Sequence, residues 1–390
     1  MVVANPPYMG SSNMNKWLTA WVKSKYKEVY RDLCTCFIKR GMSLAEDKGY
    51  EALITSDTCM YISSFERMRK MVIDRTTIVT FIDTRGTNAH PDVFDANAGW
   101  VLWNHHGENV LGAYFKLNHP IAEKGERLLE ALAKPDCGWF YRCDQKSFTR
   151  IPGDPIAYWA SSSAINAFDS FSPLEQFATP RQGLATSNNN RFLRKWWEVS
   201  RSNTCRTCKS HEDALASGSR WFPIIRGGSF RKWYGVYDEV VDWLDNGSEM
   251  KKEVLRKYPY LNTPDFVIKN QADYFKPAVT WSKISSGVVS FRFAPEGMLF
   301  EVAGACMFAD ESTLESVQGL CNSSVALQLL SFLAPTLNYE VGQIGLIPFS
   351  EEIRIKSLTI NAIVSELRSL SEKEIGQFET TWDFKRHPLA

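Results

Sequence analysis

A stiff turn that carries an amide and an aromatic ring stands near the beginning of this chain of 390 residues. The tetrapeptide Asn5-Pro6-Pro7-Tyr8 follows three apolar residues. The two prolines fix φ and remove two backbone donors, so the carbonyl groups of Asn5 and Pro6 remain as acceptors. The Asn5 side chain adds another acceptor, and Tyr8 supplies a flat ring. This combination suits a planar NH2 group, because acceptors can hold both hydrogens while the adjoining ring stacks on Tyr8 and the nitrogen lone pair is directed at an electrophile.

Such a turn needs a rigid sheet behind it. Short apolar runs predict strands at residues 2–4, 51–55, 78–82 and 99–103. Helical spacing of apolar residues predicts helices at about 14–30 and 32–47, and a third that Ser64 can cap. This alternation predicts an open α/β sheet whose last two strands are close enough in sequence to pair antiparallel. Ligands of such sheets bind at the carboxyl ends of strands, which is where the tetrapeptide stands.

After about residue 117 the alternation stops. Residues 118–160 carry prolines, glycines and short mixed runs, and from about 168 to 349 aromatic residues and turn pairs predict an α+β domain with short strands. A helix at 314–333 is expected to break near Gly319 and Asn322. The sequence therefore predicts four parts, which are a first domain at 1–120, a connection at 121–165, a second domain at 166–350 and a helical tail at 351–390.

The tetrapeptide after an apolar strand resembles the catalytic motif of amino-group methyltransferases that use S-adenosylmethionine, chiefly N6-adenine DNA methyltransferases. The resemblance implies that Asn5 and the Pro6 carbonyl accept hydrogen bonds from adenine N6, and that Tyr8 stacks on a base flipped out of the duplex. It also implies an aromatic residue on the far side of the base, for which Trp103 is the first candidate and Phe94 the second. For the tetrapeptide alone, an ordinary proline turn is the alternative.

Three later segments resemble the target recognition domain of large bacterial restriction-modification and phage-defence methyltransferases, in particular the adenine-specific methyltransferases of BREX systems. They are RQGLATSNNNRFLRKWWEV at 181–199, RWFPIIRGGSFRKWYG at 220–235 and APTLNYEVGQIGLIPF at 334–349. The resemblance implies the later half of a Rossmann-like methyltransferase sheet followed by an α+β recognition domain. It also implies S-adenosyl-L-methionine as cofactor and double-stranded DNA as partner.

The charge of the second domain is uneven. Residues 181–232 hold eleven Lys or Arg residues against three acidic ones, a local net charge of +8 in a chain whose net charge is +1. Such a block indicates a polyanion contact, with a solvated surface as the alternative. The resemblance places the Gly-Leu-Ala-Thr segment and the Arg-Gly-Gly turn near nucleic acid. Candidate DNA-binding residues have side chains suited to bases or phosphates, or are glycines that admit close approach: Arg181, Gln182, Asn190, Arg191, Arg194, Arg226, Gly227, Gly228, Arg231 and Lys232.

The cofactor site that the resemblance implies is incomplete. Methyltransferases of this class hold S-adenosylmethionine in a glycine-rich loop that precedes the catalytic motif, and only four residues precede Asn5. We therefore expect a piece of a larger methyltransferase whose partner is the missing N-terminal half or another defence-system subunit. Strand 2–4 is then an exposed sheet edge open to pairing with another chain. By itself this chain is expected to bind no S-adenosylmethionine.

Other features exclude some classes of protein. No run of about 18 apolar residues predicts a membrane span, and no secretory signal peptide is present. Nine scattered cysteines indicate reduced thiols in a cytoplasmic protein. Cys205, Cys208 and His211 have the spacing of half a zinc site without a second pair, so we predict no metal site. Two further hypotheses are a non-catalytic DNA-recognition module, and a protein-glutamine methyltransferase, against which the basic second domain argues.

Overall fold

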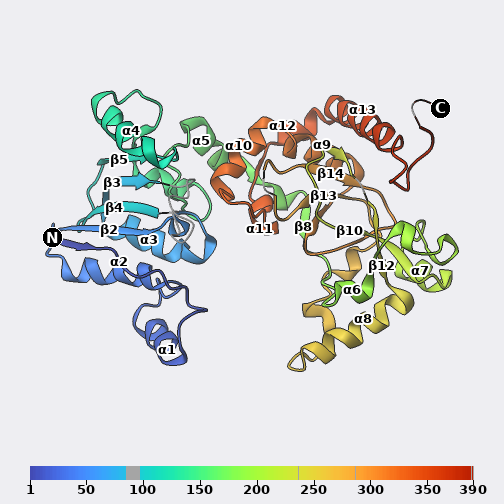
Figure 1. Cartoon of the computed structure of the whole chain (residues 1–390). Helices are drawn as coiled ribbons and strands as arrows, with labels where there is room; N and C mark the ends of the chain where they lie inside the picture. Colours follow the sequence, from blue (N-terminus) through green and yellow to red (C-terminus); the bar gives the residue numbers. More distant parts are fainter. Residues whose placement is uncertain (85–96, 236, 286, 388, 390) are drawn as a thin grey trace. The chain divides into compact units, whose positions relative to one another are not determined.

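The computed structural model describes residues 1–84, 97–235, 237–285, 287–387 and 389. The chain forms two compact units, Met1–Asp169 and Ser170–Ala390 (Figure 1). Each unit has its own hydrophobic core. None of the described helices is both long and apolar enough to cross a membrane.

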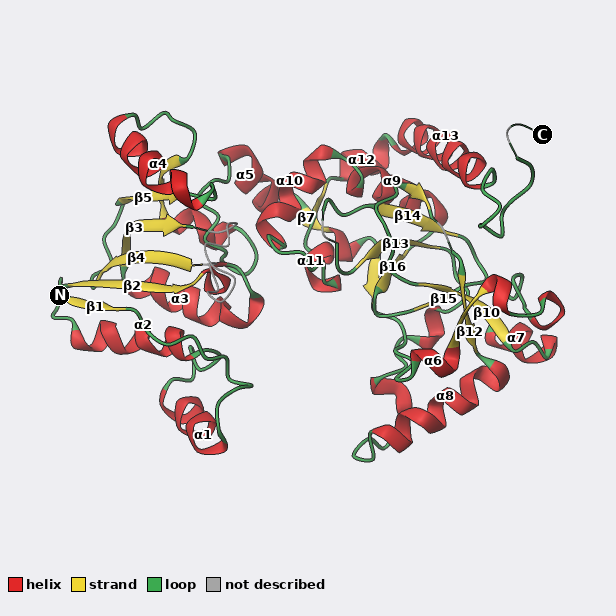
Figure 2. Cartoon of the chain, viewed as in Figure 1, coloured by secondary structure: helices red, strands yellow, loops and turns green. Residues whose placement is uncertain are grey.

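Unit 1 is built on a mixed sheet of six strands. Its order is β1-β2-β4-β3-β5-β6, with β1 at one edge (Figure 2). β1 pairs parallel with β2 and β3 with β5, whereas β2 with β4, β3 with β4 and β5 with β6 are antiparallel. The predicted antiparallel pairing of the last two strands is confirmed by β3 and β4. The strands span Val2–Ala4 (β1), Tyr50–Ser56 (β2), Thr77–Asp83 (β3), Asn97–Trp103 (β4), Leu111–Lys116 (β5) and Phe140–Asp144 (β6).

The predicted helices of unit 1 are present with shorter bounds. They are α1 (Lys16–Lys25), α2 (Leu33–Leu44) and α3 (Glu66–Arg75). Asp32 is the N-cap of α2, and its carboxylate accepts from the Cys34 N–H at 2.9 Å. The expected cap of α3 at Ser64 is wrong, because Ser64 lies in a 3₁₀ turn that leads directly into the helix.

The segment expected as a connection belongs largely to unit 1. It contains α4 (Ile121–Ala133) and β6, and β6 completes the sheet beside β5. Tyr158 is buried and donates to the Asp83 carboxylate at 2.8 Å, and Gln145 donates to the carbonyl groups of Ile73 and Thr76. These side chains bond to residues far away in sequence, which explains why local patterning did not reveal them. α5 (Ser162–Ser170) ends at the boundary between the units.

Unit 2 contains three small sheets, in agreement with the α+β prediction. Their orders are β15-β10-β12-β9, β11-β14-β13-β16-β8 and β17-β7. The strands are short and often fully buried, as expected for the centre of a packed domain. They span Ser172–Pro173 (β7), Thr179–Arg181 (β8), Leu193–Lys195 (β9), Trp221–Ile225 (β10), Trp233–Tyr234 (β11), Glu239–Asp242 (β12), Ala278–Ser282 (β13), Phe291–Ala294 (β14), Leu299–Phe300 (β15), Gly304–Phe308 (β16) and Pro348–Phe349 (β17).

The helices of unit 2 surround these sheets. The predicted break near Asn322 is confirmed, because α9 ends at Cys321 and α10 begins at Ser324. The predicted tail forms α12 and α13 and packs within unit 2, where Arg368 donates to Gln318 of α9 at 2.6 Å. The helices span Asn189–Phe192 (α6), His211–Ser217 (α7), Leu244–Lys257 (α8), Glu311–Cys321 (α9), Ser324–Leu333 (α10), Val341–Gly345 (α11), Glu351–Ile355 (α12) and Ser357–Ile375 (α13).

Candidate functional site

The proline turn lies directly after β1, at the sheet edge of unit 1. Pro6 is buried and anchors the turn, whereas Asn5 is exposed and its side-chain amide bonds to no described residue. Tyr8 is 39% exposed, and its hydroxyl donates a long hydrogen bond of 3.4 Å to the Ile54 carbonyl. The acceptor and the ring are therefore both accessible at the carboxyl end of β1, which is the arrangement that the sequence predicts.

The loop after Tyr8 is held by the beginning of α2. The Asp32 carboxylate accepts from the Met9 N–H at 3.2 Å in addition to capping α2, and the Leu33 N–H donates to the Met9 carbonyl at 3.0 Å. A further backbone bond of 2.8 Å joins the Ser11 N–H to the Arg31 carbonyl. Asp32 is thus a positioning residue that sequence reasoning placed only at a helix start. Its acidic side chain just before a helix was the available signal.

Tyr8 is half-buried beside two thiols and the Asp32 carboxylate. Burial raises the pKa of its phenol, and the neighbouring Cys34, Cys59 and Asp32 raise it further. Burial also raises the pKa of the Cys59 thiol to about 12 and that of Cys34 above its usual range. The two thiols and the phenol therefore carry no charge at neutral pH, which suits a surface on which an uncharged ring stacks.

Trp103 is the wrong partner for Tyr8. It pairs with Tyr50 across β2 and β4, whereas Ile54, which accepts the Tyr8 hydroxyl, pairs with Gly99. Four strand residues separate the two positions, a distance of about 13 Å at about 3.3 Å per residue. Trp103 instead donates from its indole N–H to the Lys48 carbonyl at 3.1 Å. The strand was correct, but its direction places this tryptophan at the opposite end of the sheet.

The second candidate, Phe94, lies outside the described residues. The strand that follows it begins at Asn97, which pairs with Ser56 at the end of β2 nearer to the proline turn. Phe94 therefore remains a prediction.

The candidate DNA-binding residues of unit 2 are mostly held by acceptors of the protein. Of the eleven basic residues in 181–232, eight form ion pairs with carboxylates, and in the described part of the chain Arg194, Arg201 and Lys232 form none. The acids come from elsewhere in unit 2, so the local excess of +8 is largely neutralised in space. The polyanion contact and its alternative, a solvated surface, both remain predictions for this block.

The predicted DNA-binding residues between Arg181 and Arg194 differ in the groups that they contact. Arg181 lies 3.8 Å from Asp273, Gln182 donates to Glu340 at 3.1 Å, and Asn190 is exposed on α6. Arg191 pairs with Glu249 and Glu253, and Arg194 donates to the Asn190 and Leu193 carbonyl groups.

In the Arg-Gly-Gly turn and the residues after it, the basic side chains also bond to acceptors of the protein. Arg226 pairs with Glu239 at 2.7 Å and also with the buried Glu301. Gly227 and Gly228 are exposed. Arg231 pairs with Glu374 at 3.0 Å, and Lys232 donates to the Asn322 carbonyl at 2.8 Å.

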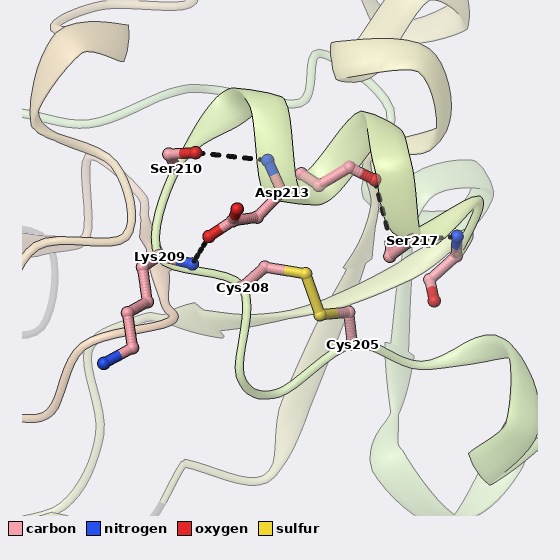
Figure 3. The surroundings of a disulfide bond; sticks show 8 residues. Cys205, Cys208, Lys209, Ser210, Asp213 and Ser217 are labelled. Atoms are coloured by element: carbon pink, nitrogen blue, oxygen red, sulfur yellow. Dashed lines mark hydrogen bonds between the residues drawn. A yellow bond between two sulfur atoms is a disulfide. The ribbon is translucent and has the colours of Figure 1, made fainter.

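The zinc pattern has a different structure. Cys205 and Cys208 form a disulfide, as Figure 3 shows, so the expectation of reduced thiols is wrong for this pair. His211 contacts Asn246 at 3.0 Å and the Gln271 carbonyl at 2.9 Å through its two ring nitrogens. Within the described ranges, no three His, Cys, Asp or Glu residues are grouped so as to hold a metal ion.

The chain is similar to several known methyltransferases and restriction-modification enzymes. Residues 1–90 match the family model of the Eco57I restriction-modification methylase. Over 392 residues the chain is 31% identical to the adenine-specific methyltransferase PglX of Lacticaseibacillus casei (strain Zhang), an alignment that covers 99% of this chain and 32% of PglX. This chain is similar to part of PglX over nearly all of its own length. A second relative, BrxX of Escherichia coli O9:H4 (strain HS), is 30% identical over 395 residues and is covered to 30% of its length. The chain thus spans about a third of the relatives it matches.

Solved structures show the same fold. The type IIL restriction-modification enzyme MmeI, solved in complex with DNA, superposes with a TM-score of 0.61 at 12% identity, over 99% of this chain and 51% of MmeI. The DrdV–DNA complex gives a TM-score of 0.51 at 12% identity, over 95% of this chain and 44% of DrdV. At this level of identity the two likenesses concern the fold alone.

Proposed function

We propose that this chain supplies the catalytic turn and the recognition domain for methylation of adenine N6 in duplex DNA, within a BREX or restriction-modification defence system. The observation that carries the proposal is the position of Asn5 and Tyr8 after β1, one with an unused acceptor and the other with an accessible ring. Asn5 and the Pro6 carbonyl accept from the adenine amine, and Tyr8 stacks on the flipped base. The similarity of residues 1–90 to a methylase family supports this assignment.

The methyl donor in this proposal is S-adenosylmethionine, which supplies an electrophilic methyl group when bound. The described residues of unit 1 offer no glycine-rich loop after a strand that could hold it, so no residue of this chain is assigned to the cofactor. The edge of β1 supports a partner that brings such a loop, because Val3 is 67% exposed and β2 is the sole described strand beside β1. A strand of the partner can pair there through backbone hydrogen bonds.

The proposal is tested by adding a cofactor-binding segment from a relative. The segment of PglX that precedes its corresponding catalytic turn is produced together with this chain, and transfer of a labelled methyl group to adenine in duplex DNA is measured. We expect transfer by the pair and by neither part alone. Asn5→Ala should abolish transfer without lowering the melting temperature, because Asn5 is exposed. Undiminished transfer by Asn5→Ala would refute the proposed role of the turn.

A recognition module without catalysis is the second candidate function. It is favoured by the division of the chain, since unit 2 has its own core and does not depend on the proline turn for its packing. Under this alternative, the chain binds duplex DNA with an affinity that falls as salt is raised, and Asn5→Ala changes nothing measurable.

A further inference from the structure

A half-open cavity of about 710 Å³ lies in unit 2 beside the Arg-Gly-Gly turn. One wall carries three acids, Asp238, Glu239 and Glu301, and two bases that pair with them, Lys195 and Arg226. Lys195 pairs with Asp238 at 2.8 Å and Glu239 at 3.2 Å, and Arg226 pairs with Glu239 and Glu301. Both bases on this wall are paired with carboxylates, so the wall offers no unpaired positive charge to an anionic ligand.

The other wall contains an arginine whose charge is not compensated. Arg292, on β14, is 3% exposed, and it pairs with no carboxylate within the described parts of the chain. Its Nη2 donates weakly to the Ser282 hydroxyl at 3.3 Å, and its Nε has no hydrogen-bond partner. Burial lowers the pKa of Arg292. The groups that raise it are Tyr237 and Cys306, and neither is a carboxylate. A buried guanidinium without an anion is costly, since it loses its hydration and receives little in exchange.

The turn next to this arginine is suited to the missing anion. Gly227, Gly228 and Ser229 line the cavity, and a Cβ at Gly228 would lie 3.4 Å from Nη1 of Arg292. The Ser282 hydroxyl, which accepts from the Gly228 N–H and donates to its carbonyl, both at 3.0 Å, fixes the turn. The N–H groups of Gly227 and Ser229 bond to no acceptor among the described residues. Free backbone donors beside a guanidinium form a concave site for a phosphate.

Two other bases line the cavity, and each is paired with an acid. Among the described residues that line it, Arg292 is therefore the base without a carboxylate partner. Lys283 pairs with Glu340 at 3.0 Å, and Arg231 pairs with Glu374, and neither of these acids lines the cavity. We infer that this cavity is a phosphate-binding site in which Arg292 and the Gly227–Ser229 turn hold one phosphate group. If the phosphate belongs to duplex DNA, the inference rests on the proposed function. The binding of a phosphate group by this cavity does not depend on that function.

The decisive variant is Gly228→Asp, which keeps Arg292 and places a carboxylate next to it. Gly228 is exposed and its φ is not positive, so the aspartate can be accommodated. The expected result without ligand is a higher melting temperature, because the guanidinium gains a counter-ion. Gly228→Ala is the steric control, and Lys252→Gln, an exposed site on α8, matches the change in net charge.

Two measurements on the full chain test the site. Inorganic phosphate, added at constant ionic strength against chloride, should raise the melting temperature of the wild type and of Gly228→Ala but not that of Gly228→Asp. Anisotropy of a labelled duplex should show at least ten-fold weaker binding by Gly228→Asp than by Lys252→Gln, with a slope of log K against log salt smaller by about 1. Arg292→Gln should reproduce both losses if it folds.

The outcomes separate the possibilities. An equal response of the wild type and Gly228→Asp to phosphate, or no response of the wild type, overturns the site. A lost phosphate response with an unchanged salt slope overturns DNA as the source and assigns the site to a free phosphate compound. A phosphate response that persists when the complemented enzyme transfers no methyl group refutes the proposed function and leaves this inference standing.

Discussion

The carboxylate of Asp32 accepts a hydrogen bond from the backbone N–H of Met9 at 3.2 Å. This bond ties the first residue after the proline turn to the N-cap of α2. Because the same carboxylate also caps the helix, the position of the turn and the start of the helix are coupled.

Asp32→Ala should therefore lower both stability and activity. Loss of the cap costs about 1 kcal/mol in the free energy of unfolding. Displacement of the turn should lower methyl transfer by the complemented enzyme by up to about 100-fold, since small misplacements are costly in catalysis. Asp32→Asn keeps the acceptor oxygen and should retain most of both. Chemical denaturation and initial rates measure the two effects, and a normal rate in Asp32→Ala would show that the turn does not depend on this bond.

Tyr8 should act through its ring rather than its hydroxyl. The hydrogen bond to Ile54 is long, at 3.4 Å, so Tyr8→Phe should keep kcat/KM within about three-fold of the wild type. Tyr8→Ala removes the stacking surface, which is worth about 1–3 kcal/mol, and should lower kcat/KM by about 10- to 100-fold. A Tyr8→Phe variant as impaired as Tyr8→Ala would indicate that the hydroxyl takes part directly.

Glu51 should make stability depend on pH. It lies on β2 with 1% exposure, its two carboxylate oxygens have no hydrogen-bond partner, and its carboxyl occupies the space where a Cβ of Gly41 would stand. Burial raises its pKa from 4.5 to about 8. The folded state therefore holds this proton more tightly than the unfolded chain, and this residue's contribution to the free energy of unfolding falls as pH rises from about 4.5 to about 8.

The test compares denaturation of the wild type and Glu51→Gln across that interval. The neutral amide does not titrate, so the difference between the two proteins should grow in favour of Glu51→Gln as pH rises, by roughly 4 kcal/mol at the alkaline end. Below pH 4.5 the difference should be constant. Parallel curves for the two proteins would mean that the carboxylate finds a partner or water when it ionises.

Arg226 should be structural as well as near the ligand. It pairs with Glu239 and with Glu301, which is 7% exposed, so Arg226→Gln leaves a buried carboxylate uncompensated. We expect a loss of about 3 kcal/mol in the free energy of unfolding. Lys252→Gln, which removes an exposed partner of Glu249, should cost less than about 0.5 kcal/mol. Similar losses for the two variants would indicate that Glu301 ionises without the help of Arg226.

Local sequence patterns predicted many helices and strands of unit 1, but they did not predict where unit 1 ends. Apolar runs and helical spacing predicted β2, β3, β4 and the first three helices within a few residues. They missed β5 and β6. The residues of β6 have mixed character because β6 lies at the sheet edge and, among the described strands, pairs with β5 alone. The place of Tyr158 in the core of unit 1 depends on its hydrogen bond to Asp83, seventy-five positions away, which no local pattern reports.

The sequence by itself determined that the turn from Asn5 to Tyr8 is stiff, because two prolines restrict the backbone whatever surrounds them. Only the tertiary structure decided which side chains share that end of the sheet. Strand direction places Trp103 away from Tyr8, and folding brings acids from distant segments onto most of the basic block while leaving Arg292 without one. The reason is that charge pairing and strand register depend on distances in space, and residues far apart in sequence set those distances.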